Sequence, residues 1–291
     1  MRFKLLLFIL SIFIFCSGVY AQGTNKKVLF EGAELSVTGI GTSSWGTGSA
    51  EQSTEQVFTG GRSIKITTQS YFAGGQLQFA NPIDLKEESK DPNRYLMMVF
   101  FFKEVVPIDP TGGYAYYYDI EPYTVPITQR VRVILVSDKG KMVATEQFTN
   151  PLDPDDNWVR MAIPLSRFNV EGEESFKLSK MIITSSVPAT MFLGELSVLT
   201  DTEPIIVEKL ENRTVSPGDI IFIMANAKAG FSSLKYSWDF DASNGIQQEW
   251  TERIARYIYT RPGEYTITLT VSDADGIKEP VTVTCVISVT G

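Results

Sequence analysis

The segments KYSWDFDASNG, residues 235–245, and ARYIYTRPGEYTITLTVSDADG, residues 255–276, decide the fold of the last third of this chain. Both have the residue chemistry of β-strands. From Tyr265 to Ser272, apolar residues alternate with Thr and Ser, which places apolar side chains on one face of a sheet and hydroxyls on the other. Pro262-Gly263 predicts a turn before this strand, and Asp275-Gly276 predicts one after it. The C-terminal third is therefore expected to consist of strands.

These segments resemble a polycystic-kidney-disease (PKD) repeat, an immunoglobulin-like sandwich. Its hallmarks are a Trp-Asp-Phe-Gly-Asp-Gly turn and a later Tyr-x-x-x-Gly-x-Tyr-x-Val-x-Leu strand. The resemblance covers residues 204–289, and the chain departs from it at Asn244-Gly245, where a tight turn is expected instead. A PKD-like domain has no catalytic residues to carry over. The resemblance thus implies a spacer or interaction module and leaves the main function to the preceding residues.

The chain begins like an exported protein. Two basic residues precede an apolar run over residues 5–15, which predicts a signal peptide of bacterial type over residues 1–21. The run is too short to span a bilayer, so no transmembrane segment is expected after cleavage. A lipoprotein would be acylated at Cys16, but Phe15 stands where such a site needs a small residue. A secreted or cell-surface protein is the expectation, and a lipid anchor is the disfavoured alternative.

Charge and composition exclude several classes of function. Removing the two basic residues of the signal peptide from 26 Lys plus Arg leaves 24 against 34 Asp plus Glu, a formal charge of −10. Such a surface repels nucleic acid. The sequence contains no His, which excludes Ser-His-Asp catalysis and His-ligated zinc. Carboxylate-based glycoside hydrolysis stays open, because it needs only two acids. Cys285 alone remains after cleavage, so no intrachain disulfide can form.

Residues 27–201 read as strands separated by turns. This pattern, which contains no convincing helical stretch, predicts an antiparallel β-sandwich of jelly-roll kind. We expect it to require no cofactor. The clearest strand segments are SIKITT (63–68), GQLQFA (75–80), YLMMVFFFK (95–103), RVRVILVS (130–137), NWVRMAIPL (157–165), KMIITSS (180–186) and TMFLGELSVL (190–199).

This domain resembles the galactose-binding-like jelly rolls that serve as carbohydrate-binding modules. Four stretches carry the resemblance in the family's order: VLFEG (28–32), GGRSIKI (60–66), ANPIDLKEES (80–89) and DNWVRMAIPLSRF (156–168). In the last strand, FLGELSVL offers Glu195 where the family has an acid. The resemblance implies a carbohydrate ligand. It also implies a structural calcium held by Glu31 or Glu34 together with Glu195; the alternative is that these acids face solvent or an arginine.

A tyrosine-rich segment is the first candidate for the ligand site. Residues 106–128, VPIDPTGGYAYYYDIEPYTVPIT, are longer than a hairpin needs. A tyrosine ring can stack on a sugar while its hydroxyl bonds the sugar's edge. The alternative is a flap that covers a sheet edge. The candidate ligand residues here are Tyr114, Tyr116, Tyr117, Tyr118 and Tyr123, and the next ones to examine are Trp45 and Tyr71.

The sequence therefore predicts an all-β, two-domain, non-catalytic protein that binds a polysaccharide or other glycan through its jelly roll, with the boundary between residues 199 and 206. The first alternative is a surface adhesion or assembly protein that binds a protein partner. The second is a carboxylate-dependent, glycan-active enzyme.

Overall fold

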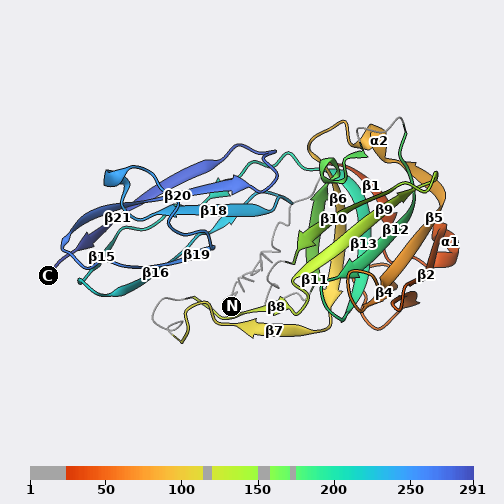
Figure 1. Ribbon diagram of the computed structural model, residues 1–291, viewed down its shortest axis with the longest axis horizontal. Helices are drawn as coiled ribbons and strands as arrows, with labels where there is room; N and C mark the ends of the chain where they lie inside the picture. The colour runs from red at the N-terminus through yellow and green to blue at the C-terminus, as the bar shows by residue number, and fades with distance from the viewer. Residues whose placement is uncertain (1–23, 114–119, 150–157, 171–174) are drawn as a thin grey trace, which may run out of the picture.

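The computed structural model describes residues 24–113, 120–149, 158–170 and 175–291. Two lobes lie end to end along the long axis, and the C-terminus lies at the far end of the smaller one (Figure 1). The all-β prediction is confirmed, since the described helices have only three or four residues: α1 (Leu35–Thr38), α2 (Leu85–Glu88), η1 (Leu165–Phe168) and η3 (Ala242–Asn244). In the described part of the chain no helix is long enough to cross a membrane.

The larger lobe is the predicted antiparallel sandwich. Its first sheet has the order β11-β6-β13-β4-β3, with β1 beside β13: β11 (Trp158–Pro164), β6 (Arg94–Phe102), β13 (Ala189–Thr200), β4 (Ser63–Thr68), β3 (Ser49–Ser53) and β1 (Thr24–Phe30). The second sheet has the order β10-β9-β12-β5-β2: β10 (Met142–Phe148), β9 (Arg130–Ser137), β12 (Lys177–Ser185), β5 (Gly74–Asp84) and β2 (Ile40–Trp45).

The core of this lobe lies between the two sheets. In β9, Val131, Val133 and Leu135 point inward and are fully buried, while the residues between them point to the other face of the sheet. Facing them across the sandwich, β6 contributes Leu96 and Met98 to the same cluster. Hydrophobic burial on the inner faces of both sheets is thus what fixes the register of each strand.

The outer face of the first sheet is also largely covered. Tyr95, Met97 and Val99 on the outer side of β6 are buried in a second cluster. Two residues of the smaller lobe, Phe231 and Ile277, pack against this cluster. This explains why β6 is apolar throughout rather than alternating: both of its faces are covered.

A two-stranded ribbon connects the two sheets of the sandwich. Its strands, β7 (Val105–Ile108) and β8 (Tyr123–Pro126), pair with each other and with no other described strand. The ribbon runs out from the sandwich toward the smaller lobe (Figure 1). It carries part of the tyrosine-rich segment, and Tyr123 is its half-buried first residue on the return. Tyr114, Tyr116, Tyr117 and Tyr118 lie outside the described residues, as does the predicted signal peptide.

The smaller lobe is a second sandwich with its own core. Four strands form its main sheet, in the order β15-β21-β20-β18: β15 (Arg213–Val215), β21 (Val281–Val289), β20 (Gly263–Asp273) and β18 (Leu234–Asp239). Two strand pairs face it: β16 (Ile220–Met224) with β19 (Ile254–Ile258), and β14 (Ile206–Val207) with β17 (Ala227–Lys228). Trp238 is fully buried in this core, and Cys285 is buried in the same cluster.

Candidate functional site

The outer face of the second sheet carries aromatic and hydrogen-bonding side chains on neighbouring strands. Side chains that are paired across neighbouring strands point to the same face. The pairs Trp45–Gly74, Thr184–Arg132 and Arg132–Glu146 therefore form one row across the sheet. Five strands spaced about 4.8 Å apart make this face roughly 19 Å wide. That width accommodates several sugar rings in line or a short peptide.

Aromatic rings border one end of the face. Trp45 ends β2 and is half-buried, while Tyr71 and Phe72 lie in the turn before β5. Phe72 is 79% exposed, and Phe148, at the end of β10, is 60% exposed. Four rings with accessible surface at one end of a sheet are more than an isolated exposed residue, and they supply flat apolar surfaces for a ligand.

Glycines bring the Trp45 turn against the Tyr71 turn. Gly46 follows Trp45 with φ +60°, in the left-handed region that favours glycine, and a Cβ there would lie 2.6 Å from the Phe72 carbonyl oxygen. Two residues later, a Cβ on Gly48 would lie 2.4 Å from the Gly74 backbone. The glycine-rich sequence around Trp45 is thus explained by close contact between two loops.

A charged group occupies the same row. Glu146 Oε1 accepts hydrogen bonds from Arg132 Nη2 at 2.6 Å and Nε at 3.1 Å, and Tyr71 Oη donates to Glu146 Oε2 at 3.4 Å. The Arg132 guanidinium stacks over the Tyr71 ring, with 4.1 Å to the ring centroid. Hydrogen bonds from Arg132 hold the pKa of Glu146 below its usual value, so it stays ionised. The result is a fixed arrangement of ring, cation and carboxylate.

Neutral polar groups line the strands beside it. Gln76 donates from Nε2 to Ser43 Oγ at 3.0 Å, and the exposed Gln78 approaches the same hydroxyl at 3.5 Å. Thr184, at the centre of the row, has a buried hydroxyl oxygen without a hydrogen-bond partner in the described structure. Gln76 and Thr184 are themselves buried, so the exposed Gln78 is the group among these three that a ligand can reach directly.

The structure brings together two predicted ligand residues, Trp45 and Tyr71, at this end of the face. The sequence analysis missed Arg132, Glu146 and Gln76, which complete the group. The alternation in RVRVILVS could have identified the two arginines, because it places Arg130 and Arg132 on the sheet face opposite to that of the buried valines.

The three predicted calcium ligands are not brought into one cluster. Glu34 pairs with Arg62 at 2.6 Å, which lowers the pKa of Glu34, and Glu195 pairs with the Lys26 ammonium at 2.7 Å. Glu31 is exposed. Among the described residues no group of three or more acids, cysteines or histidines could hold a metal ion. Two of the acids thus have basic partners, and calcium binding stays a prediction.

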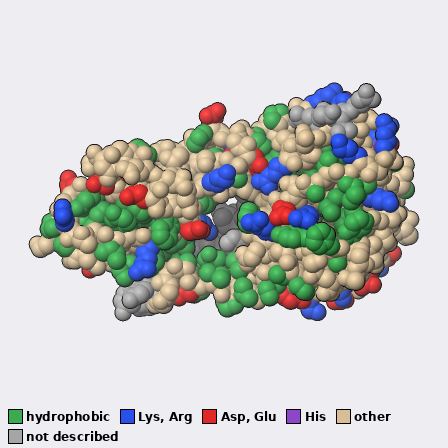
Figure 2. Space-filling view, viewed as in Figure 1, with side chains coloured by type: hydrophobic (Ala, Val, Ile, Leu, Met, Phe, Trp, Pro, Cys, Tyr) green, Lys and Arg blue, Asp and Glu red, His purple; other side chains and the backbone are tan. Residues whose placement is uncertain are grey.

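Charged residues of this face lie at the molecular surface. Over β9 and β10, basic and acidic side chains lie beside hydrophobic ones (Figure 2). Arg130 stacks on Phe148, with 4.3 Å from the guanidinium carbon to the ring centroid, and reaches Glu146 at 3.5 Å. The stacked ring and guanidinium therefore form a fixed apolar and cationic surface beside Glu146.

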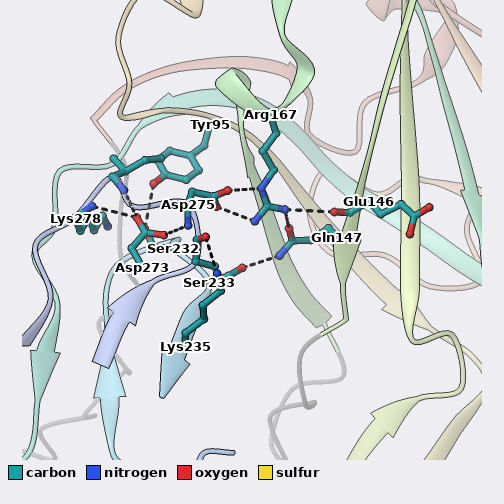
Figure 3. A network of polar contacts seen from close by, with 12 residues as sticks. Tyr95, Glu146, Gln147, Arg167, Ser232, Ser233, Lys235, Asp273, Asp275 and Lys278 are labelled. Atoms are coloured by element: carbon teal, nitrogen blue, oxygen red, sulfur yellow. Dashed lines mark hydrogen bonds and ion pairs between the residues drawn. The ribbon is translucent and has the colours of Figure 1, made fainter. Parts of the chain in front are cut away.

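The smaller lobe contacts β10, the strand that carries Glu146. Asp275 accepts two hydrogen bonds from Arg167, at 2.5 and 2.7 Å, and Arg167 also donates to the Glu146 carbonyl and to Gln147 Oε1 (Figure 3). Gln147 in turn donates to Ser233 Oγ at 2.7 Å. Among the described strands β10 pairs only with β9, so these contacts cover the edge strand of the sheet.

Tyr95 joins the lobes within the same network (Figure 3). Its hydroxyl lies 3.0 Å from Ser232 Oγ, the side chain is 1% exposed, and burial raises the pKa of Tyr95 to about 12. Unfolding exposes the phenol, whose pKa then returns to about 10. The stability that a neutral Tyr95 contributes is therefore complete below pH 10 and is lost as the pH rises through 12.

We expect wild-type protein to lose up to about 2 kcal/mol more stability between pH 9 and pH 12 than the variant Tyr95→Phe, which cannot ionise. Urea unfolding at both pH values measures the difference. The variant Tyr123→Phe, at a half-buried tyrosine of the β7–β8 ribbon, serves as the control. Equal losses in wild type and Tyr95→Phe would show that the phenol reaches solvent.

Comparison with known protein families identifies the domain type of the smaller lobe. The model of the PKD domain family matches residues 201–289. A search of curated proteins found no match to the chain. This family match confirms the resemblance seen in the WDFD and PGEYTITLTV segments.

Similar solved structures show only distant likeness. One is a quinoprotein alcohol dehydrogenase-like protein from Bacteroides thetaiotaomicron, with 14% identity, TM-score 0.24, and coverage of 29% of this chain and 18% of that one. A second contains carbohydrate-binding modules of the β-sandwich superfamily, with 17% identity, TM-score 0.33, and coverage of 62% and 63%. A third is a xylan-binding domain of carbohydrate-binding module family 22, with 10% identity, TM-score 0.31, and coverage of 60% and 94%.

This chain spans less than two thirds of the length of the first two structures. At these TM-scores, the architecture of the larger lobe is taken from its own strand pairing, which is that of an antiparallel β-sandwich. For the smaller lobe, a family model matches the sequence itself. Residues 201–289 are a PKD domain.

Proposed function

We propose that this chain is an exported, non-catalytic glycan-binding protein, and that the outer face of the second sheet holds the glycan. One observation carries the proposal: Trp45 and Tyr71 lie on the same sheet face as the Arg132–Glu146 pair and the side-chain amide of Gln76. Sugar rings present apolar faces and hydroxyl edges. Aromatic rings beside fixed donors and acceptors match both.

The same geometry supports a binding role rather than hydrolysis. Glycoside cleavage needs two carboxyl groups across the bond, one of them protonated. Among the described residues, Glu146 is the carboxylate beside the aromatic rings, and arginine hydrogen bonds keep its pKa low. The other acid on this face, Asp84, lies at the far end of β5, where it caps α2. The PKD domain then acts as a spacer or interaction module that carries the binding face.

Binding of the purified chain to a panel of soluble polysaccharides tests the proposal, with affinity electrophoresis as the screen and calorimetry for quantification. We expect the double variant Trp45→Ala with Tyr71→Ala to bind any ligand found at least about tenfold more weakly, because each stacked ring contributes on the order of 1 kcal/mol. The control is Tyr123→Ala on the β7–β8 ribbon. Full affinity in the folded double variant would contradict the assignment of the site to this face. A loss of affinity in the control would place the site at the tyrosine-rich segment instead.

A protein partner is the second candidate, and the β7–β8 ribbon favours it. Val105 and Ile108 on the ribbon are 41% and 37% exposed, and Ile127, just after it, is 43% exposed. The ribbon's strands also have unpaired edges among the described residues, which a strand of a partner could extend. Val105→Asp would weaken such a complex without changing glycan binding, which distinguishes the two functions.

A further inference from the structure

The binding face has the opposite charge to the rest of the molecule. By strand alternation, four basic side chains and two acids point to this face: Arg130, Arg132, Lys177, Lys180, Asp84 and Glu146. The face thus carries a formal charge of +2 in a chain whose total is −8, which leaves −10 for all other residues. In an acidic protein, basic residues gathered on one sheet face attract anions to that face.

The basic groups retain free hydrogen-bonding capacity. Arg130 reaches Glu146 through one nitrogen at 3.5 Å and otherwise lies flat on Phe148. A guanidinium has five N–H donors, and toward the described residues most of those on Arg130 are available to a ligand. Stacking on the ring fixes the orientation of its plane, and a planar fork of this kind is suited to a carboxylate.

Lys180 lies at the other end of the face. It pairs across the sheet with Gln78 on one side and Val136 on the other, is exposed, and forms no ion pair with any described residue. Val136 and Arg130 are six residues apart on β9, which corresponds to roughly 20 Å. A ligand that reaches both basic ends must therefore be a chain of several sugar rings.

Resting on the proposed glycan-binding function, we propose that the face is selective for acidic polysaccharides, whose uronate carboxylates are bound by Arg130 at one end and Lys180 at the other. Glu146 adds to this selectivity by orienting Arg132. The aromatic rings at the Trp45 end stack on the sugar rings. The basic side chains favour polysaccharides whose sugars carry carboxylates.

The test uses polymer pairs that differ only in charge: polygalacturonate, alginate, glucuronoxylan and hyaluronan, each beside its carboxyl-reduced form. We expect at least one acidic polymer to bind the full chain tenfold or more tightly than its neutral partner. Its affinity should fall as NaCl rises from 0.05 to 0.5 M, because salt screens exposed charges.

Matched lysine variants locate the effect. Lys180→Gln should lower affinity for the acidic polymer about two- to fivefold and leave affinity for the neutral form unchanged. Lys228→Gln, which removes an exposed lysine from β17 of the PKD domain, should change neither. Arg130→Gln should act like Lys180→Gln, with a larger loss because the stacked fork is removed.

The outcomes separate this inference from the function on which it rests. Neutral forms binding as tightly as acidic ones, with the Trp45 and Tyr71 variant still impaired, would overturn the selectivity and keep the glycan site. Failure of every polymer, acidic and neutral, to bind would overturn both. Equal losses in Lys180→Gln and Lys228→Gln would show that net charge, rather than this face, attracts the polymer.

Discussion

Asp201→Asn is expected to lower the free energy of unfolding by about 3–5 kcal/mol, because it leaves a buried lysine without its counter-ion. Asp201 Oδ2 lies 2.8 Å from Lys278 Nζ, and the two side chains are 1% and 5% exposed. The same carboxylate accepts a 2.6 Å hydrogen bond from the Phe231 amide. Urea unfolding of the full chain measures the loss.

Two control variants test whether the loss comes from the buried ion pair rather than from removing a negative charge. Glu203→Gln removes the same charge two residues away at an exposed position, and it should change stability by no more than about 0.5 kcal/mol. Adding Lys278→Met to Asp201→Asn removes the orphaned cation and should recover part of the loss. A loss below about 1 kcal/mol for Asp201→Asn would mean that water reaches the pair in solution.

Trp238→Ala is expected to destabilise the PKD domain by about 3–5 kcal/mol. The side chain is fully buried, and its indole nitrogen donates to the Glu252 carbonyl at 2.9 Å. Truncation therefore creates a large cavity and removes this hydrogen bond. Calorimetry of the full chain checks this expectation and shows which transition moves.

A matched core variant of the sandwich tests how the two cores are coupled. Leu77→Ala removes a fully buried side chain from the core of the larger lobe. If the domains fold independently, as the sequence predicts, Trp238→Ala and Leu77→Ala shift different transitions. A single transition shifted by both variants would show that the Arg167–Asp275 and Lys278–Asp201 contacts make the two lobes one cooperative unit.

Local sequence was sufficient to predict most strands. Where one face of a strand meets a core, side-chain alternation identifies the strand and its inner face, as in RVRVILVS, which is β9 from its first residue to its last. Short or polar strands such as β2, IGTSSW, have no such pattern and were not predicted. The strand expected over GQLQFA, residues 75–80, is longer than its pattern indicates, because β5 continues to Asp84, whose side chain then caps α2.

The sequence by itself determined the class, the two sandwiches and the PKD domain, because turn residues and the period of two act over a few residues. Only the tertiary structure decided the site. Trp45 and Glu146 are far apart in the chain and share a row because β5, β12 and β9 lie between their strands in the sheet. Arg167 meets Asp275 across 108 residues, and Arg62 rather than calcium meets Glu34. Strand order and domain docking depend on which apolar faces bury each other, and no local pattern specifies that choice.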